Sequence, residues 1–279
     1  MTRLNDEDIQ SIIKQYRKNE EFFIKNFKFS LLEIGNKAVN NAASKEQLKN
    51  LKVACIPITS GFGEISNFSQ IVCTILTDCC GVNAFVTKQK NVAGIQEAYE
   101  QKSDIIFMAD DNTFTAFHLK KNLYMNNGEA TGRGFAAALD VAAGPLQNKE
   151  VLVLGAGPVA CAGATYLLQR NAHVKMYDPC MDKVRTYIKK YPQVEMVPHW
   201  NTRTWNYILE ATPSANIITE NQVTSQTICA APGVPFGLDE FSVKKCKLII
   251  HNLLELGVAT MLSGVCKEES HGKENYYSL

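Results

Sequence analysis

The sequence predicts an α/β protein in which an N-terminal α/β substrate domain is followed by a Rossmann-type NAD-binding domain. Short apolar runs alternate with helical stretches along most of the chain, which is typical of sheets covered by helices. A helix of small residues ending at Gly144 and Pro145 separates two such regions. The second region opens with an apolar run and a glycine-rich loop at Gly155, the pattern of a dinucleotide-binding unit. The 279 residues, 46% of them hydrophobic, are enough for two cores.

The composition excludes several classes of partner. Lys+Arg 29 against Asp+Glu 28 gives a net charge of +1, so the chain lacks the basic surface that captures nucleic acid or anionic lipid. No stretch approaches the roughly 20 apolar residues that span a bilayer, and we expect a cytoplasmic protein without a membrane partner. The cysteines lack paired ligand spacing, so we expect reduced thiols and no bound metal. The oligomeric state is left open, with a homodimer as one option.

The first domain is placed at residues 1–146. Asn5 or Asp6 can cap an initial helix whose apolar side chains share one face, and the Ala-rich helix at residues 135–143 is expected to connect the domains. Apolar runs between them predict buried strands, separated by helices. The predicted strands are residues 53–58, 83–87 and 105–108, and the predicted helices are residues 31–43, 66–80 and 92–101.

The second domain is placed at residues 147–266, including a C-terminal helix that closes the cofactor pocket. Its apolar runs again predict buried parallel strands. These strands are expected at residues 151–154, 174–177, 207–211, 228–231 and 248–250. The polar stretch 267–279 lacks periodicity and is expected to be a disordered tail.

The glycine-rich loop predicts where the cofactor pyrophosphate binds. Gly155 permits the tight turn after the strand, and Gly157 lets the pyrophosphate approach the backbone. Pro158 suits the first turn of the following helix, which continues through Val159. The free amides and the positive end of this helix dipole would then face the pyrophosphate.

A carboxylate at the end of the second strand favours NAD over NADP. Asp178 follows the glycine loop by about 20 residues, the spacing at which a carboxylate reaches the adenosine ribose hydroxyls. A negative charge there would repel the additional phosphate of NADP. The alternative is that Asp178 caps the segment beginning at Pro179.

Two later strand ends are expected to meet the nicotinamide. Open α/β sheets bind ligands at the carboxyl ends of their strands, although ordinary turn chemistry could explain the same prolines. The predicted cofactor contacts are Ala211, Thr212, Pro213 and Pro232, with Gly257 and Thr260 on the last helix completing the pocket.

The end of the strand at residues 105–108 carries two carboxylates, Asp110 and Asp111. A carboxylate beside a nicotinamide can anchor a cationic amine and accept its proton, and hydride leaves a neutral amine more readily than an ammonium. Because an alkylammonium has a pKa of about 10.4, one carboxylate would have to take the proton. The alternative is that one of them caps a following helix, on whose apolar face His118 would lie as a satisfied histidine. Further candidates for substrate binding are Ser60, Gly61, Phe68, Asn112 and Asn127.

Several stretches resemble the pyrrolysine synthase family, in register over about residues 50–265. The matching motifs include Pro57-Ile58-Thr59-Ser60-Gly61, Met108-Ala109-Asp110-Asp111-Asn112-Thr113-Phe114, Asn126-Asn127, Glu210-Ala211-Thr212-Pro213, Pro232-Gly233-Val234-Pro235 and Gly257-Val258-Ala259-Thr260-Met261-Leu262. The resemblance implies that NAD oxidises the terminal amine of 3-methyl-D-ornithine linked to the side-chain amine of lysine. Ring closure with loss of ammonia would then give pyrrolysine.

The resemblance also implies roles for individual residues. Asp111 would handle the substrate amine, and Phe68 and Asn127 would line the pocket. The N-terminal helix around Leu4 would close over the ligand.

Two other functions compete with this one. A dehydrogenase of the shikimate or methylene-tetrahydrofolate type would also join a substrate domain to a Rossmann unit, but such sites use a lysine base in the first domain. Lys88 and Lys120 are available, yet neither sits at a predicted strand end next to polar ligands. A non-catalytic NAD-sensing regulator would leave the facing pocket apolar, whereas this pocket is expected to hold Asp110 and Asp111.

Overall fold

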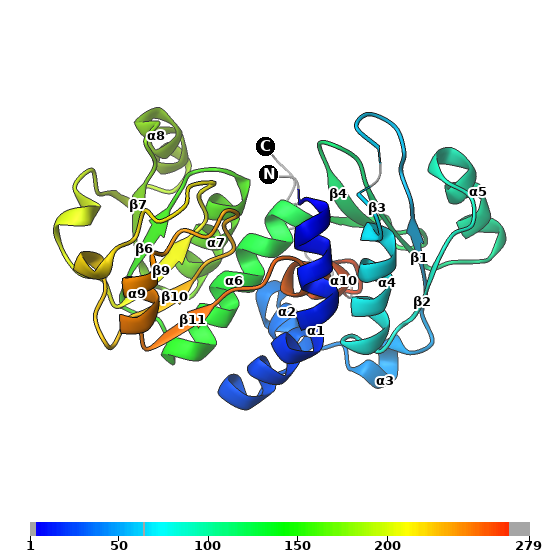
Figure 1. Cartoon of the computed structure of the whole chain (residues 1–279), viewed down its shortest axis with the longest axis horizontal. Helices are drawn as coiled ribbons and strands as arrows, with labels where there is room; N and C mark the ends of the chain where they lie inside the picture. Colours follow the sequence, from blue (N-terminus) through cyan, green and yellow to red (C-terminus); the bar gives the residue numbers. More distant parts are fainter. Residues whose placement is uncertain (1–3, 64, 268–279) are drawn as a thin grey trace.

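Two β-sheets lie side by side with a layer of helices between them, in a computed structural model that describes residues 4–63 and 65–267 (Figure 1). The N-terminal sheet has the strand order β2-β1-β3-β4-β5, and the C-terminal sheet has the order β11-β10-β9-β6-β7-β8. The predicted α/β class, with a Rossmann-like second half, is confirmed.

The N-terminal sheet is mixed. Its strands are β1 (Lys52–Ile56), β2 (Asn83–Val86), β3 (Ile105–Ala109), β4 (Phe114–His118) and β5 (Leu123–Asn126). Strand β1 pairs in parallel with β2 and β3, whereas β4 and β5 are antiparallel to their neighbours. Helices α4 (Phe68–Asp78) and α5 (Asn91–Glu100) connect the three parallel strands, as the alternation of apolar runs predicted.

The helix that the alternative placed after the carboxylate pair does not form, because β3 turns directly into the antiparallel strand β4. The turn is closed by Asp110, whose Oδ1 accepts hydrogen bonds from the amides of Asn112 (2.8 Å) and Thr113 (2.7 Å). His118 therefore lies on a strand. Its ring is buried, which lowers its pKa, and its Nδ1 accepts a hydrogen bond from the amide of Lys120.

The C-terminal sheet has the strand order of a dinucleotide-binding fold, counted from β6 as the first strand. Neighbouring strands are parallel. The strands are β6 (Glu150–Leu154), β7 (His173–Tyr177), β8 (Glu195–Met196), β9 (Tyr207–Glu210), β10 (Ile228–Ala230) and β11 (Leu248–Ile250). The five predicted runs all form strands, whereas the two-residue β8 is too short to give a sequence pattern. Helices α7 (Pro158–Gln169), α8 (Met181–Lys190) and α9 (Glu240–Lys245) belong to this half.

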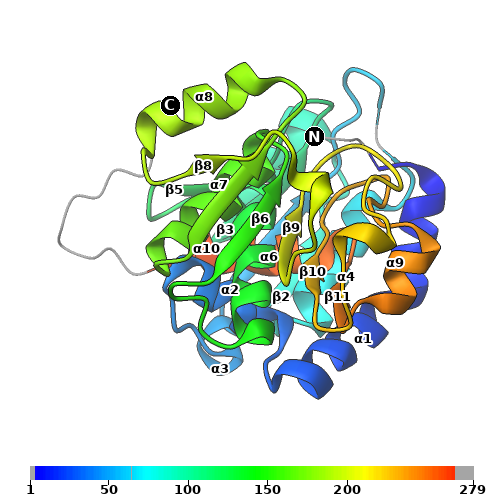
Figure 2. The ribbon, with the colours of Figure 1, turned by 90° about the vertical axis from the view of Figure 1, so that its left-hand side faces the viewer.

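The helical layer between the sheets is built from α2 (Leu31–Val39), α6 (Asn127–Ala143) and α10 (Glu255–Val265), which pack against one another (Figures 1 and 2). Helix α10 also packs on α4, β4 and β5 of the N-terminal half. Helix α6 begins earlier than expected because the Asn126 side chain caps it, accepting a hydrogen bond from the Glu129 amide.

The first helix, α1 (Asp6–Phe27), begins as predicted, with Asn5 and Asp8 forming a capping box. It is followed by α2 and the short α3 (Lys45–Leu48). No helix in the described ranges is long and apolar enough to cross a bilayer. The division of the chain between residues 146 and 147 stays a prediction, and all but Lys267 of the expected tail lies outside the described residues.

Candidate active site

A cavity of about 870 Å³ lies between the two sheets and is lined from both halves of the chain. Its walls include the residues that follow β1 and β3 on one side and β6, β7, β9 and β10 on the other. The carboxyl ends of parallel strands are where open α/β sheets bind ligands. The cavity therefore occupies the position at which the two predicted sites would face each other.

The glycine loop fits a dinucleotide. Gly155 has φ +102°, and a Cβ there would lie 2.9 Å from the carbonyl oxygen of Ala211, so this turn requires glycine. At Gly157 a Cβ would meet nothing within 4 Å, and Gly157, Pro158 and Val159 line the cavity. Helix α7 starts here without a side-chain cap. Its first amides thus border open space of the kind a pyrophosphate occupies.

Asp178 connects the glycine loop to the end of β7. Its Oδ2 accepts a hydrogen bond from the Ala156 amide (2.8 Å), and its Oδ1 accepts one from the Cys180 amide (2.8 Å). Cys180 is the residue before α8. The hydrogen bond from its amide therefore also gives Asp178 a local role at the start of that helix. Because an ionised carboxylate offers about four lone-pair sites, Asp178 still has acceptor capacity for ribose hydroxyls at the cavity wall.

The end of the cavity where the nicotinamide was expected is formed by the loops after β9 and β10. Of the predicted contacts, Ala211, Thr212, Pro213 and Pro232 line it, together with Ser214, Ile217, Gly233 and Val234, which were not predicted. Gly257 and Thr260 do not line it. A Cβ at Gly257 would lie 2.7 Å from Asn127 Oδ1, and the Thr260 hydroxyl donates to the carbonyl of Leu256. These two residues instead pack α10 against α6.

Asp111 lines the opposite wall. Its Oδ2 accepts a hydrogen bond from the Phe62 amide (2.8 Å). Gly61 has φ +71°, and a Cβ there would lie 1.9 Å from the same oxygen. The loop after β1 thus holds the carboxylate with a backbone amide, and a glycine without a side chain allows the close approach. Ser60 and Gly61 do not line the cavity, and Gly61 acts on the site by making room for Asp111.

Asp110 also lines the cavity, but its position differs from that of Asp111. Its Oδ1 is occupied by the two amides of the turn, and its own amide donates to the carbonyl of Thr113. The structure therefore separates the pair: Asp110 closes the hairpin turn, and Asp111 meets the loop that borders the cavity.

The remaining predicted substrate residues, Leu4, Phe68, Asn112 and Asn127, all line the cavity. The Phe68 ring lies edge-on to Phe114 at 5.2 Å between centroids, forming an apolar wall beside Asp111. Thr131, which was not predicted, also lines the cavity, and its hydroxyl donates to Asn127 Oδ1 (3.1 Å). This bond fixes the orientation of the Asn127 amide.

Sequence reasoning missed the wall beyond Asp178. Tyr177, Pro179, Lys183, Trp200 and Asn201 line this part of the cavity. The Tyr177 and Trp200 rings lie 5.9 Å apart between centroids. Trp200 opens a single 3₁₀ turn after the two-residue β8, so no periodic pattern marked it. These flat and apolar surfaces suit the adenosine part of a dinucleotide.

Two thiols near the cavity are not nucleophiles. Cys55 lines the cavity floor from β1, and burial raises the pKa of its thiol. Cys161, in the second turn of α7, has a pKa raised to about 11, mainly by burial and further by Asp178. Because the thiolate is the reactive form, neither group offers covalent catalysis near neutral pH.

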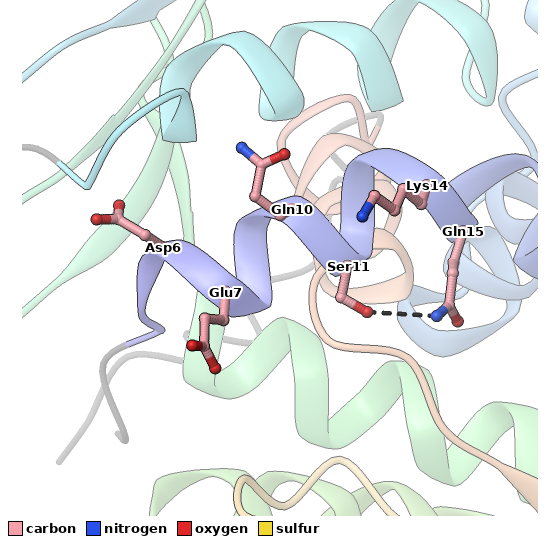
Figure 3. A pocket seen from close by; sticks show the side chains of 6 residues that line it. All are labelled: Asp6, Glu7, Gln10, Ser11, Lys14 and Gln15. Carbon is pink, nitrogen blue, oxygen red and sulfur yellow. Dashed lines mark hydrogen bonds between the residues drawn. The ribbon is translucent and has the colours of Figure 1, made fainter.

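A second hollow lies along α1 and is lined by Asp6, Glu7, Gln10, Ser11, Lys14 and Gln15 (Figure 3). All six come from successive turns of one helix, with Ser11 and Gln15 joined by a hydrogen bond. Such a surface has no enclosing walls, so it carries no candidate site.

Two family models match different parts of the chain. Residues 8–125 match the family described as pyrrolysine biosynthesis protein PylD, N-terminal domain, and residues 143–233 match a family described as NAD(P)-binding. The pyrrolysine synthase of Methanosarcina barkeri is 35% identical over 217 residues, which cover 77% of this chain and 81% of that protein. The pyrrolysine synthase of Methanosarcina acetivorans is 33% identical over 77% of this chain and 82% of its own length.

Solved structures share the fold at low sequence identity. An Ael1 enzyme from Pseudomonas putida has a TM-score of 0.52 at 12% identity, covering 77% of this chain and 90% of that one. A 5-ketofructose reductase of a Gluconobacter species has a TM-score of 0.52 at 15% identity over 77% and 91%. A shikimate 5-dehydrogenase from Thermus thermophilus has a TM-score of 0.50 at 14% identity over 76% and 91%. These similarities show a common fold. They do not identify the substrate, which must be argued from the residues that line the cavity.

Proposed function

This chain belongs to the pyrrolysine synthase family, and we propose that it oxidises the terminal amine of 3-methyl-D-ornithyl-N6-L-lysine with NAD and cyclises the product to L-pyrrolysine. At the coarser level it is a nicotinamide-dependent oxidoreductase of pyrrolysine biosynthesis. The proposal of amine oxidation rests on the position of Asp111, which lines the cavity on the side opposite the glycine loop.

Asp111 would prepare the amine for oxidation. The substrate amine arrives as an ammonium, and the carboxylate accepts one of its protons to leave the neutral amine. The Phe62 amide and the bare backbone of Gly61 hold the carboxylate in place. Bound NAD supplies the acceptor for the hydride that leaves the adjacent carbon. The carbon–nitrogen bond of the substrate thereby becomes an imine.

Ring closure requires no further redox partner. The ornithine α-amine attacks the imine carbon, a new carbon–nitrogen double bond forms in the ring, and the original terminal nitrogen leaves as ammonia. Phe68 and Phe114 give this part of the cavity an apolar wall, which would limit the access of water to the imine. A buried amine also loses its proton more readily than a solvated one.

The other proposed contacts divide between the two ligands. Leu4, Ser60, Asn112 and Asn127 would contact or support the substrate, and residues 1–146 would form the substrate domain. Residues 147–266 would form the cofactor domain. The proposed cofactor contacts are Gly155, Gly157, Pro158, Val159, Asp178, Ala211, Thr212, Pro213 and Pro232. The choice of NAD rests on Asp178, whose charge at the cavity wall would repel a ribose phosphate.

The competing dehydrogenase chemistry has less support. It needs a lysine base in the first domain, but Lys120 donates to Asp104 (2.6 Å) and neither it nor Lys88 lines the cavity. Lys183 lines the cavity from the other half, beside Asp178.

The test is NADH formation with the lysine-linked methylornithine and with its unmethylated D-ornithine analogue. We expect NADH and released ammonia in equal amounts from either substrate. If the purified protein yields NADH from neither substrate, the proposed reaction is wrong.

A further inference from the structure

Behind the nicotinamide wall lies a carboxyl that the proposed reaction does not use. Glu210 is the last residue of β9 and is 0% exposed. Its Oε1 accepts hydrogen bonds from the amide (2.7 Å) and the hydroxyl (2.5 Å) of Thr212. Thr212 itself lines the cavity. One oxygen of Glu210 therefore holds the loop after β9 from behind.

The second oxygen packs closely against the loop after β10. Glu210 Oε2 is buried and has no hydrogen-bond partner among the residues described. A Cβ placed on either Gly233 or Gly237 would lie 2.5 Å from it. The loop after β10 thus passes directly over the carboxyl, and at two positions the absence of a side chain allows this close approach. One of these residues, Gly233, also lines the cavity.

The two loops meet beyond the carboxyl as well. The amide of Asn216 donates to the carbonyl of Phe236 (3.2 Å), and the amide of Ile218 donates to the carbonyl of Gly237 (2.9 Å). Glu210 is therefore enclosed at the joint of two loops that together form one end of the cofactor cavity.

The surroundings of Glu210 favour its neutral form. A carboxylate oxygen in a dry site without a donor is costly, and burial raises the pKa of Glu210 to about 7, although the Thr212 bonds lower it. From β10 the titratable neighbour is the buried Cys229, whose own thiol pKa is raised by burial and by Glu210. On β6 the paired residue is the apolar Leu154. The loop over the carboxyl, residues 232–237, carries no ionisable side chain.

We propose that Glu210 is a positioning residue for the cofactor, which supports both nicotinamide-facing loops as a neutral carboxyl and loosens them when it ionises. Cofactor affinity would then fall in mildly alkaline solution. The effect would be indirect, because no ionisable group would touch the cofactor at this end of the cavity. The inference rests on the cofactor placement proposed above and is independent of which amine is oxidised.

The experiment measures NADH binding to the full chain by fluorescence titration between pH 6 and pH 9, without amine substrate. The wild-type dissociation constant should rise by about tenfold for each pH unit above the ionisation, as linkage requires when only the neutral form binds well. Glu210→Gln keeps an acceptor for Thr212 and cannot ionise, so its binding should be independent of pH over this range.

Glu20→Gln is the matched control. Glu20 lies on α1 and is also partly enclosed: its Oε2 accepts from the Leu31 amide, its Oε1 lacks a hydrogen-bond partner among the described residues, and burial raises its pKa. This variant should keep the wild-type pH dependence of NADH binding.

Three outcomes would overturn the inference: pH-independent wild-type affinity, a Glu210→Gln variant that keeps the wild-type profile, or the loss of that profile in Glu20→Gln. The wild-type measurement tests the inference even if the Gln variant fails to fold.

Thermal unfolding of the ligand-free proteins separates a structural role of Glu210 from a positioning role. A merely structural Glu210 would make the melting temperature depend on pH but leave NADH affinity constant. If the amine assay fails but NADH affinity depends on pH as expected, the proposed reaction is rejected and this inference stands.

Discussion

The ends of β3 and β9 each present a carboxyl group at the carboxyl edge of a sheet, yet the two groups differ in what surrounds them. Asp111, just after β3, lines the cavity and accepts a hydrogen bond from the Phe62 amide. Glu210, the last residue of β9, is enclosed by two glycines and Thr212. Position at a strand end alone therefore does not decide whether a carboxyl group lines the cavity. The loop that crosses the carboxyl decides whether it lines the cavity or is enclosed behind the cavity wall.

The comparison is tested most severely at Asp111. Asp111→Asn should lower turnover by about 10²–10⁴, the range for a lost general base, while NAD affinity stays unchanged. Raising the pH should partly restore turnover, because more free amine exists before binding. The measurement is a pH profile of kcat and of kcat/KM with the lysine-linked substrate, since kcat/KM follows ionisations of the free species. Wild-type turnover in the variant would remove Asp111 from the chemistry.

At Glu210 we expect a large effect on stability, with the sign set by its raised pKa. The neutral form is favoured in the folded chain, so its stabilising contribution is complete below the unfolded value of 4.5 and is lost as pH rises toward about 7. Relative to wild type, Glu210→Gln should therefore gain on the order of 3 kcal/mol between pH 4.5 and pH 7.5. Urea denaturation of both proteins at each pH measures this difference. A constant difference would mean that Glu210 is ionised throughout or solvated.

Asp178 adds a third carboxylate at a strand end, intermediate between the other two. It lines the cavity, but both oxygens already accept backbone amides. Asp178→Ala should weaken NAD binding by about 1.5–3 kcal/mol, the scale of hydrogen bonds to a charged group. Calorimetry with NAD and NADP checks both the loss and the selectivity. Equal wild-type affinity for the two cofactors would contradict the role of its charge.

The smallest effect is expected at Asp110, which sharpens the contrast within the pair. Asp110→Ala removes the acceptor for two turn amides, so it should lower the free energy of unfolding by about 1–2 kcal/mol. Its turnover should stay within about tenfold of wild type, far above that of Asp111→Asn. Urea denaturation and kcat measured on the same preparation provide the test. A loss of turnover equal to that of Asp111→Asn would mean that the two carboxylates act together.

Local patterns in the sequence were sufficient for the features that depend on neighbouring residues. The apolar runs at residues 151–154 and 174–177 form β6 and β7, since a buried parallel strand is apolar on both faces. The glycine loop lies where strand, turn and helix were expected, because Gly155 must adopt a backbone that other residues avoid. The cap at Asn5 was visible for the same reason: its partner Asp8 lies within one turn.

Tertiary structure decided the features that depend on distant segments. The β4–β5 hairpin forms because β4 pairs with the edge of β3, a contact that a short alternating segment does not reveal. Gly257 was expected at the cofactor but instead accommodates Asn127 of α6.

The two strand-end carboxyls show the limit of sequence reasoning. The sequence by itself determined that acidic residues follow β3 and end β9, because strand ends are marked by local apolar runs. Whether each carboxyl meets the cavity depends on a loop from another part of the chain: the loop at Gly61 leaves Asp111 at the cavity wall, and the loop at Gly233 encloses Glu210. Burial, and with it the charge of a carboxyl, is a property of the packed structure, because desolvation depends on every segment that surrounds the group.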